Sequence, residues 1–238
     1  MNKFIDYFSP EKEIIKEKFN TIPYMDIWIS SIVEGYIYEN VTKVDKYGYK
    51  IENKMKYNKM IETKHWYKNG QMSFEYYYKN GLKNGTCKRW YKNGQPFTYI
   101  SYKEGKKDGE YKRWMNKNGQ LWEKVYYKEG KRDGKYKWWY SNGQLGVQEY
   151  YKEGKLEGEC TEWHDNGQLH FQRYYKEGER DGEYTEWYYN GQLKTQCYYK
   201  EGKLEGEYKE WQQNGELWHQ AYYKNGQPTV STYNLEIL

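Results

Sequence analysis

The sequence predicts an all-β protein, folded as one elongated, twisted antiparallel sheet of about seven β-hairpin repeats. Three observations predict this fold. Similar stretches recur about every 24 residues, glycine-containing turn signals recur about every 12 residues, and the runs between the turns are rich in Tyr, Trp and Thr. A fixed period indicates a repeat architecture, and turns this frequent leave no room for helices between the strands.

The N-terminal segment, residues 1–62, lacks the regular repeat. Residues 9–11 read Ser-Pro-Glu, which is typical of a helix start, so we expect a short helix over residues 10–19 that caps the sheet. Residues 34–59 are expected to form two or three strands of a degenerate repeat, because the terminal units of such arrays are atypical. Residues 10–28 weakly resemble the opening of an F-box helical module, which would instead make this segment a small adaptor.

The regular repeats are expected to fill residues 63–228 without a linker. Each unit has a tryptophan shortly before an Asn-Gly pair, and one turn, within residues 115–118, carries an extra residue that predicts a bulge or a longer turn. Asn-Gly between strand-like runs is the strongest short-range hairpin signal, so we expect primed turns there, with positive φ at both central residues. The other turn of each unit usually reads Lys-Glu-Gly-Lys.

The C-terminal segment, residues 229–238, has strand composition and no turn glycine. We expect it to be a capping strand. Its short length and Pro228 would help to blunt the open edge of the sheet.

Side chains alternate between the two faces of a strand, so sequence parity assigns them to faces. In the strand after residues 190–191, the odd-numbered side chains are expected on one, more apolar face: Leu193, Thr195, Cys197 and Tyr199. The even-numbered ones are expected on the other face. Tyr184 and Trp187 are three residues apart and should lie on opposite faces unless a bulge intervenes. Both faces therefore carry aromatic side chains.

The repeat resembles the MORN-repeat family in its second variant, which includes bacterial antitoxin-like repeat proteins. The matching motifs are Asn-Gly-Gln-Leu at residues 190–193, Tyr-Lys-Glu-Gly-Lys-Leu-Glu-Gly at 199–206 and Trp-Tyr-Tyr at 187–189. The likeness covers roughly residues 64–228. It implies a scaffolding or tethering module, and an association with membrane surfaces is often proposed for this family. Four residues depart from the pattern: Cys87, Pro96, Ser101 and Cys160.

The composition argues against several classes of function. The net charge is +5, and its excess lies in the repeats, where Lys and Glu are mixed locally; a nucleic-acid binder should concentrate basic charge on one face. Three scattered cysteines are expected to be small buried thiols. The four histidines share no register, and no nucleophile with a base can be nominated, so we expect no enzyme, no cofactor and no metal.

No apolar run approaches the ~20 residues of a membrane span, and the N-terminus lacks a signal-peptide core. We therefore expect a soluble, cytoplasmic protein.

The function expected from these features is a non-catalytic scaffold that binds a protein or peptide through an aromatic-lined sheet face. The alternative is association with an anionic membrane surface, and a weaker one is an antitoxin-like or F-box-like adaptor. Tyr and Trp are enriched among binding hot spots, although the same side chains could simply hold a thin sheet together. The candidate partner-binding residues are Trp90, Trp114, Trp139, Trp163, Trp187, Trp211, Tyr127, Tyr151, Tyr175 and Tyr199.

Overall fold

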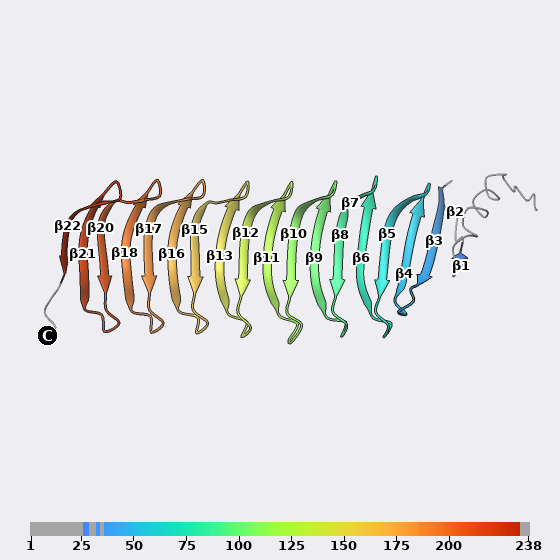
Figure 1. The fold of residues 1–238 in the computed structure, drawn as a ribbon, viewed down its shortest axis with the longest axis horizontal. Helices are drawn as coiled ribbons and strands as arrows, with labels where there is room; N and C mark the ends of the chain where they lie inside the picture. The colour runs from blue at the N-terminus through green and yellow to red at the C-terminus, as the bar shows by residue number, and fades with distance from the viewer. Residues whose placement is uncertain (1–25, 29–31, 34–35, 234–238) are drawn as a thin grey trace, which may run out of the picture.

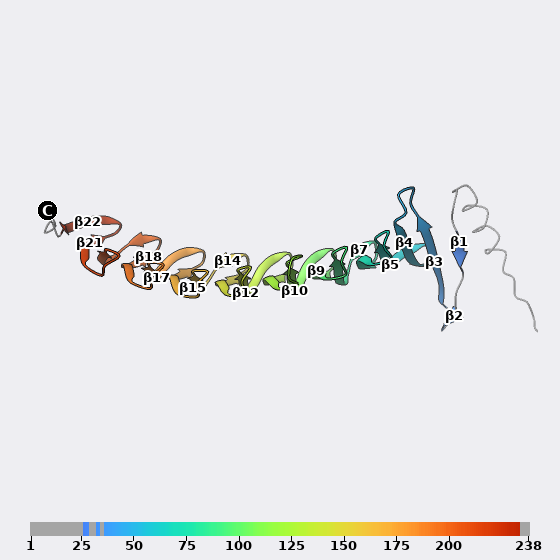
Figure 2. The same cartoon turned by 90° about the horizontal axis from the view of Figure 1, so that it is seen from below.

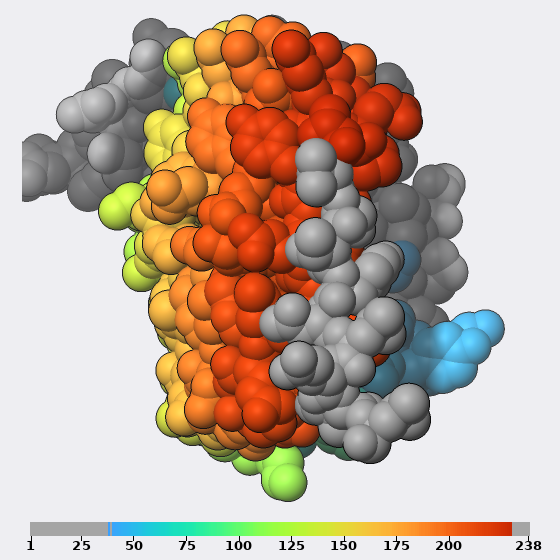
Figure 3. All heavy atoms as spheres, turned by 90° about the vertical axis from the view of Figure 1, so that its left-hand side faces the viewer, coloured from blue at the N-terminus to red at the C-terminus, as the bar shows by residue number. Residues whose placement is uncertain are grey.

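The structure, a computed structural model, describes residues 26–28, 32–33 and 36–233. These residues form one open antiparallel sheet, which runs as a meander from the third strand to the last with the first two strands both paired to the third, and no part of them is helical (Figure 1). Viewed along its strands, the described part of the chain forms a single layer (Figure 2). Figure 3 looks along the array from its C-terminal end. The helix expected over residues 10–19, and most of the F-box-like segment, lie outside the described residues.

Among the described residues, four strands precede the regular repeats, and the first two are only three and two residues long. They are β1 (Asp26–Trp28), β2 (Ile32–Val33), β3 (Tyr36–Val44) and β4 (Lys50–Lys56). Both short strands pair with β3, and β3 pairs with β4.

Each regular repeat consists of an a-strand, which ends at tryptophan, and a b-strand, which follows the Asn-Gly pair. The a-strands are β5 (Lys59–Trp66), β7–β8 (Leu82–Lys83, Gly85–Trp90), β10 (Lys106–Trp114), β12 (Lys131–Trp139), β14–β15 (Lys155–Leu156, Gly158–Trp163), β17 (Glu179–Trp187) and β19–β20 (Lys203–Leu204, Gly206–Trp211). The b-strands are β6 (Met72–Lys79), β9 (Pro96–Lys103), β11 (Leu121–Lys128), β13 (Leu145–Lys152), β16 (Leu169–Lys176), β18 (Leu193–Lys200) and β21 (Leu217–Lys224). A last strand, β22 (Gln227–Tyr233), pairs with β21.

The primed turns are the Glu-Gly turns, not the Asn-Gly turns. Glu153 and Gly154 have φ values of +51° and +89°, which are the two consecutive positive values of a type I′ turn. In the Asn-Gly turns that follow a tryptophan, only the glycine has positive φ, as at Gly191. The expectation of primed Asn-Gly turns was therefore wrong. The Asn190 side chain accepts the Gln192 N–H at 3.1 Å, and this Asx-type bond builds a longer turn.

A gain in stability is expected when the glutamates of the Glu-Gly turns are replaced by asparagine. A non-glycine residue in the left-handed region costs about 1 kcal/mol, and Asn tolerates it best; Asn80 and Asn225 already occupy the equivalent positions. We expect the combined variant to gain about 2 kcal/mol, measured by urea unfolding. Glutamine at the same positions is the control for loss of charge, and an equal gain from it would contradict the backbone explanation. The positions are Glu104, Glu129, Glu153, Glu177 and Glu201.

Hydrogen bonds join successive repeats at both ends of the strands. The side chain after the tryptophan reaches the next unit in five repeats, as where the Tyr188 hydroxyl donates to the Trp211 carbonyl at 2.9 Å. At the Glu-Gly end, the Gly202 N–H donates to the Arg180 carbonyl at 2.8 Å. The extra residue within 115–118 lengthens one turn, where the Gly119 N–H bonds to residue 115. These bonds fix the separation of neighbouring units.

A β-bulge at the start of each b-strand interrupts the alternation of side chains between the two faces. Glu186 pairs with Thr195 and Trp187 with Leu193, so Lys194 is the extra residue. Because the bulge lies in β18, alternation in β17 is unbroken, and Trp187 lies on the face opposite Glu186. Leu193 accompanies Trp187, so the expectation that Leu193 shares a face with Thr195 was wrong. We call the face of Val125 and Cys197 the core face and the other the outer face.

The best-buried side chains form one row across the middle of the core face. Val125 is 0% exposed and Cys87 and Cys160 are each 1% exposed. Large and small residues alternate along this row: Val125 lies between Tyr111 and Tyr136, and Cys197 pairs with Tyr184. Three cysteines are therefore small core residues, free and buried, and a one-layer sheet buries them because large neighbours on the same face cover them.

Candidate partner-binding faces

The structure divides the ten candidate residues between the two faces. The six tryptophans end the a-strands and lie on the outer face, whereas the four tyrosines are the second residue of each Tyr-Tyr pair and lie on the core face. All ten are half-buried. They consequently do not form one surface.

The core-face tyrosines contact cationic side chains and one another. Arg180 lies over the rings of Tyr184 and Tyr199, with its Cζ 5.4 and 5.1 Å from their centroids, and its Nη1 donates to the Tyr199 hydroxyl at 3.2 Å. Arg132 repeats this arrangement with Tyr136 and Tyr151. Cation–π contacts of this kind stabilise by about 1 kcal/mol, so these tyrosines contribute to packing.

Burial keeps the hydroxyls and thiols of the core face protonated. It raises the pKa of Tyr136 to about 12, with Glu123 adding to the effect, and raises the pKa of Tyr151 to about 12, helped by the hydrogen bond to Glu149. The Cys197 thiol is likewise raised to a pKa of about 12 by burial. These groups are neutral at physiological pH, which removes the thiolate that nucleophilic chemistry needs.

A different row of tyrosines is exposed on the outer face. These are the first residues of the Tyr-Tyr pairs, and parity had placed Tyr198 opposite Tyr199 without indicating exposure. Tyr174, at the same register, is half-buried and lies against Gly182, where an added Cβ would lie 2.8 Å from the Tyr174 Cβ; nothing lies within 4 Å of a Cβ added at Gly158 or Gly206. Four of the row are 37–54% exposed: Tyr126, Tyr150, Tyr198 and Tyr222.

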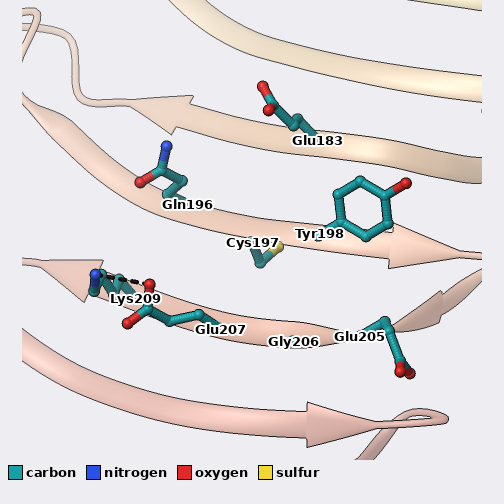
Figure 4. A pocket seen from close by; sticks show the side chains of 8 residues that line it. All are labelled: Glu183, Gln196, Cys197, Tyr198, Glu205, Gly206, Glu207 and Lys209. Atoms are coloured by element: carbon teal, nitrogen blue, oxygen red, sulfur yellow. Dashed lines mark ion pairs between the residues drawn. The ribbon is translucent and has the colours of Figure 1, made fainter.

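The outer face also has a shallow hollow, of about 480 Å³, beside Tyr198. Figure 4 shows Tyr198 between the side chains of Glu183 and Glu207, with the Glu207–Lys209 ion pair at 2.8 Å along its edge. The hollow is open, and both polar and apolar atoms line it. It can accept a polar side chain from a partner whose apolar groups lie on the tyrosine row.

One cluster on the core face has donor atoms that a metal could use. The donor atoms of Glu149, Cys160 and Glu162 lie within 4.8 Å of one another. Arg173 forms an ion pair with Glu162, and the Cys160 thiol donates to Glu149 at 3.6 Å. Burial raises the pKa of this thiol. A guanidinium and a protonated thiol already satisfy the carboxylates, so this donor set does not favour a metal.

These features define a class of protein: a β-hairpin repeat array with an open single-layer sheet. A family model for the MORN repeat variant matches six stretches that cover more than half of the sequence, and the chain belongs to this family. MORN repeats are generally non-catalytic scaffolds, often binding membranes or proteins. The unmatched unit contains the longer turn. The matched residues are 61–80, 83–104, 132–153, 156–177, 180–201 and 204–225.

A comparison with curated proteins gave no match. Across the part of the chain that the structure describes, helices with the length and apolar character needed to cross a membrane are absent.

Proposed function

We propose that the protein is a non-catalytic scaffold that binds a protein or peptide through its outer face. One observation carries the proposal: tyrosines 37–54% exposed recur at one register of a sheet face that no other layer covers. Because they are 37–54% exposed, they contribute less to the core than the half-buried tyrosines of the core face. Rigid aromatic side chains give a large contact area at a low entropic cost. The candidate tryptophans border the same face.

Replacing the four exposed tyrosines Tyr126, Tyr150, Tyr198 and Tyr222 by serine is expected to abolish peptide binding while preserving the fold. The test selects phage-displayed random peptides on the full-length protein and measures the binding of the enriched sequences by fluorescence anisotropy. We expect a loss of at least about tenfold, because hot-spot truncation costs 2 kcal/mol or more.

The matched control changes the second tyrosine of the same pairs to phenylalanine, at Tyr127, Tyr151, Tyr199 and Tyr223. This control is expected to retain binding. Failure to enrich any peptide, or peptides that bind the serine variant as tightly as the original, would refute the proposal.

A row of lysines favours a second candidate, an anionic membrane surface. Lys128, Lys152, Lys176, Lys200 and Lys224 are all exposed and lie on the outer face, two residues after the exposed tyrosines. Basic residues attract anionic lipid and aromatic residues settle at the interface, although exposed glutamates follow four of these lysines. Sedimentation with phosphatidylserine vesicles at low salt decides between the two candidates, since a peptide scaffold stays in the supernatant.

A further inference from the structure

Charge is segregated along the array. Residues 63–144 contain 19 Lys and Arg but 7 Asp and Glu, whereas residues 145–228 contain 10 and 16. The change falls between β12 and β13. Lys and Glu are mixed over short stretches of the chain, and neighbours in sequence lie on different faces. The charge difference between the two halves is therefore not visible in any single motif. One half of the sheet is therefore strongly basic and the other acidic.

Five cations of the basic half lie on the core face without an ion-pair partner. Among the described residues, none of them forms a salt bridge. Glu123 shares this face, while Asp108 and Asp133 accept backbone N–H groups of the next turn. We call these five the cationic surface: Lys83, Arg89, Lys107, Arg113 and Arg132.

Aromatic rings hold these cations in place. The Arg113 Cζ lies 5.6 Å from the Phe97 centroid and 4.3 Å from that of Trp122. The Lys107 Nζ lies 5.1 and 4.6 Å from the centroids of two tyrosines. A cation fixed in this way loses less side-chain entropy when it binds an anion. Arg113 and Lys107 remain half-buried rather than sealed.

The equivalent positions on the core face of the acidic half carry different residues. At the position of Arg89 and Arg113, the later a-strands carry Glu162, Glu186 and Glu210. The position of Lys83, Lys107 and Arg132 carries leucine in two of the three later units, at residues 156 and 204. The cationic surface consequently ends at β12.

A hollow of about 360 Å³ opens at the N-terminal end of this surface, beside Arg89. His65, Tyr67 and Phe74 line it. Asp45 lines it too, but one of its carboxylate oxygens accepts two backbone N–H groups at 2.9 Å. The hollow provides room for a side chain that reaches the Arg89 guanidinium.

We infer that the core face of β7–β12 is a docking surface for an acidic polypeptide segment, distinct from the outer face. Guanidinium groups bind carboxylates in a bidentate geometry. Equivalent positions in successive repeats are about 10 Å apart, two strand spacings. Three residues in the polyproline II conformation span about this distance and place every third side chain on the same side. A peptide with glutamate at every third position therefore matches the surface.

The geometry favours a polypeptide over a single-stranded nucleic acid. Nucleic-acid binding of that kind uses aromatic faces on which bases stack. On the cationic surface those faces are covered by cations, as with Lys83 over Tyr76 and Tyr102 at 4.4 and 5.3 Å. A flat membrane is also disfavoured, because four of the five charges are half-buried among rings and cannot reach its headgroups together.

The test measures binding of a fluorescent peptide of about 12 residues, Glu-Ser-Ser repeated, to the full-length protein by anisotropy at low salt. The chain supplies a matched pair of variants. Arg132→Gln and Arg180→Gln each remove one arginine held between two tyrosines and bonded to a hydroxyl, at 3.1 and 3.2 Å, but only Arg132 lies in the basic half. We expect Arg132→Gln to weaken binding about fivefold and Arg180→Gln to leave it unchanged.

Other outcomes overturn the inference. Equal weakening by both variants would mean attraction by overall charge, and tighter binding of oligo-dT or phosphatidylserine vesicles would mean a different partner. Absence of binding at about 1 mM protein would reject the surface altogether. Arg132→Lys, which keeps the charge, should recover binding if Arg132→Gln is folded. The outer-face serine variant should bind this peptide normally, so the outcome is independent of the proposed function.

Discussion

Gly182→Ala is expected to lower the free energy of unfolding by about 3 kcal/mol, one of the largest effects of any small substitution in this chain. Gly182 has a φ of +128°, and an added Cβ would lie 2.8 Å from the Tyr174 Cβ. The Tyr174 Cβ is bonded directly to the backbone, so a change of rotamer cannot move it away from the added Cβ. Backbone strain and steric overlap therefore act together. Urea unfolding followed by circular dichroism measures the change.

The chain contains its own control for this substitution. Gly206 occupies the equivalent position two strands later, with a φ of +82°, and nothing lies within 4 Å of its added Cβ. Gly206→Ala should therefore cost only the backbone strain, about 1 kcal/mol. Equal losses for the two variants would show that the tyrosine contact has no part in the effect.

Alkaline unfolding is the second large effect that we expect. Burial raises the pKa values of Tyr136, Tyr151 and Cys197 to about 12, whereas an unfolded tyrosine ionises near pH 10 and a cysteine near 8.5. The folded-state values are the higher ones, so the stabilisation is complete below the unfolded values and is lost as pH rises towards 12. Each tyrosine contributes roughly 2 kcal/mol over this range. Circular dichroism and tyrosinate absorbance should change together.

The control for alkaline unfolding compares two tyrosines of neighbouring strands. Tyr136→Phe removes a buried hydroxyl and should raise the midpoint pH of unfolding. Tyr150→Phe changes a side chain that is 43% exposed and should not move it. If Tyr136→Phe leaves the midpoint pH unchanged, ionisation of Tyr136 is excluded as a cause of alkaline unfolding.

The sequence was sufficient to predict the repeat, its hairpins and the open meander, because glycine and tryptophan recur at fixed positions. It could not predict the bulge at the start of each b-strand. The bulged residue is Phe97, Gly146 or Lys194 in different units, so no shared chemistry marks it. Counting the alternation of side chains through the bulge without a break assigned Leu193 to the wrong face.

The candidate sites were less predictable than the fold. Which tyrosine of a pair is exposed depends on which face carries the cations of the neighbouring strand, as with Arg180 over Tyr199, and this relation is not local in sequence. The turn type was indicated only by Asn80-Gly81 and Asn225-Gly226, where asparagine replaces the usual glutamate. Charge segregation requires counting over half of the array rather than over single motifs.

The hydrogen bonds between successive turns have a consequence for selectivity. They hold equivalent side chains at a constant pitch of about 10 Å, so the molecule behaves as a ruler. A ligand whose determinants match that pitch engages several units at once and gains from the high effective concentration of each later contact. A ligand with a different pitch engages one unit and dissociates quickly. Discrimination by spacing therefore needs no unit to bind tightly by itself.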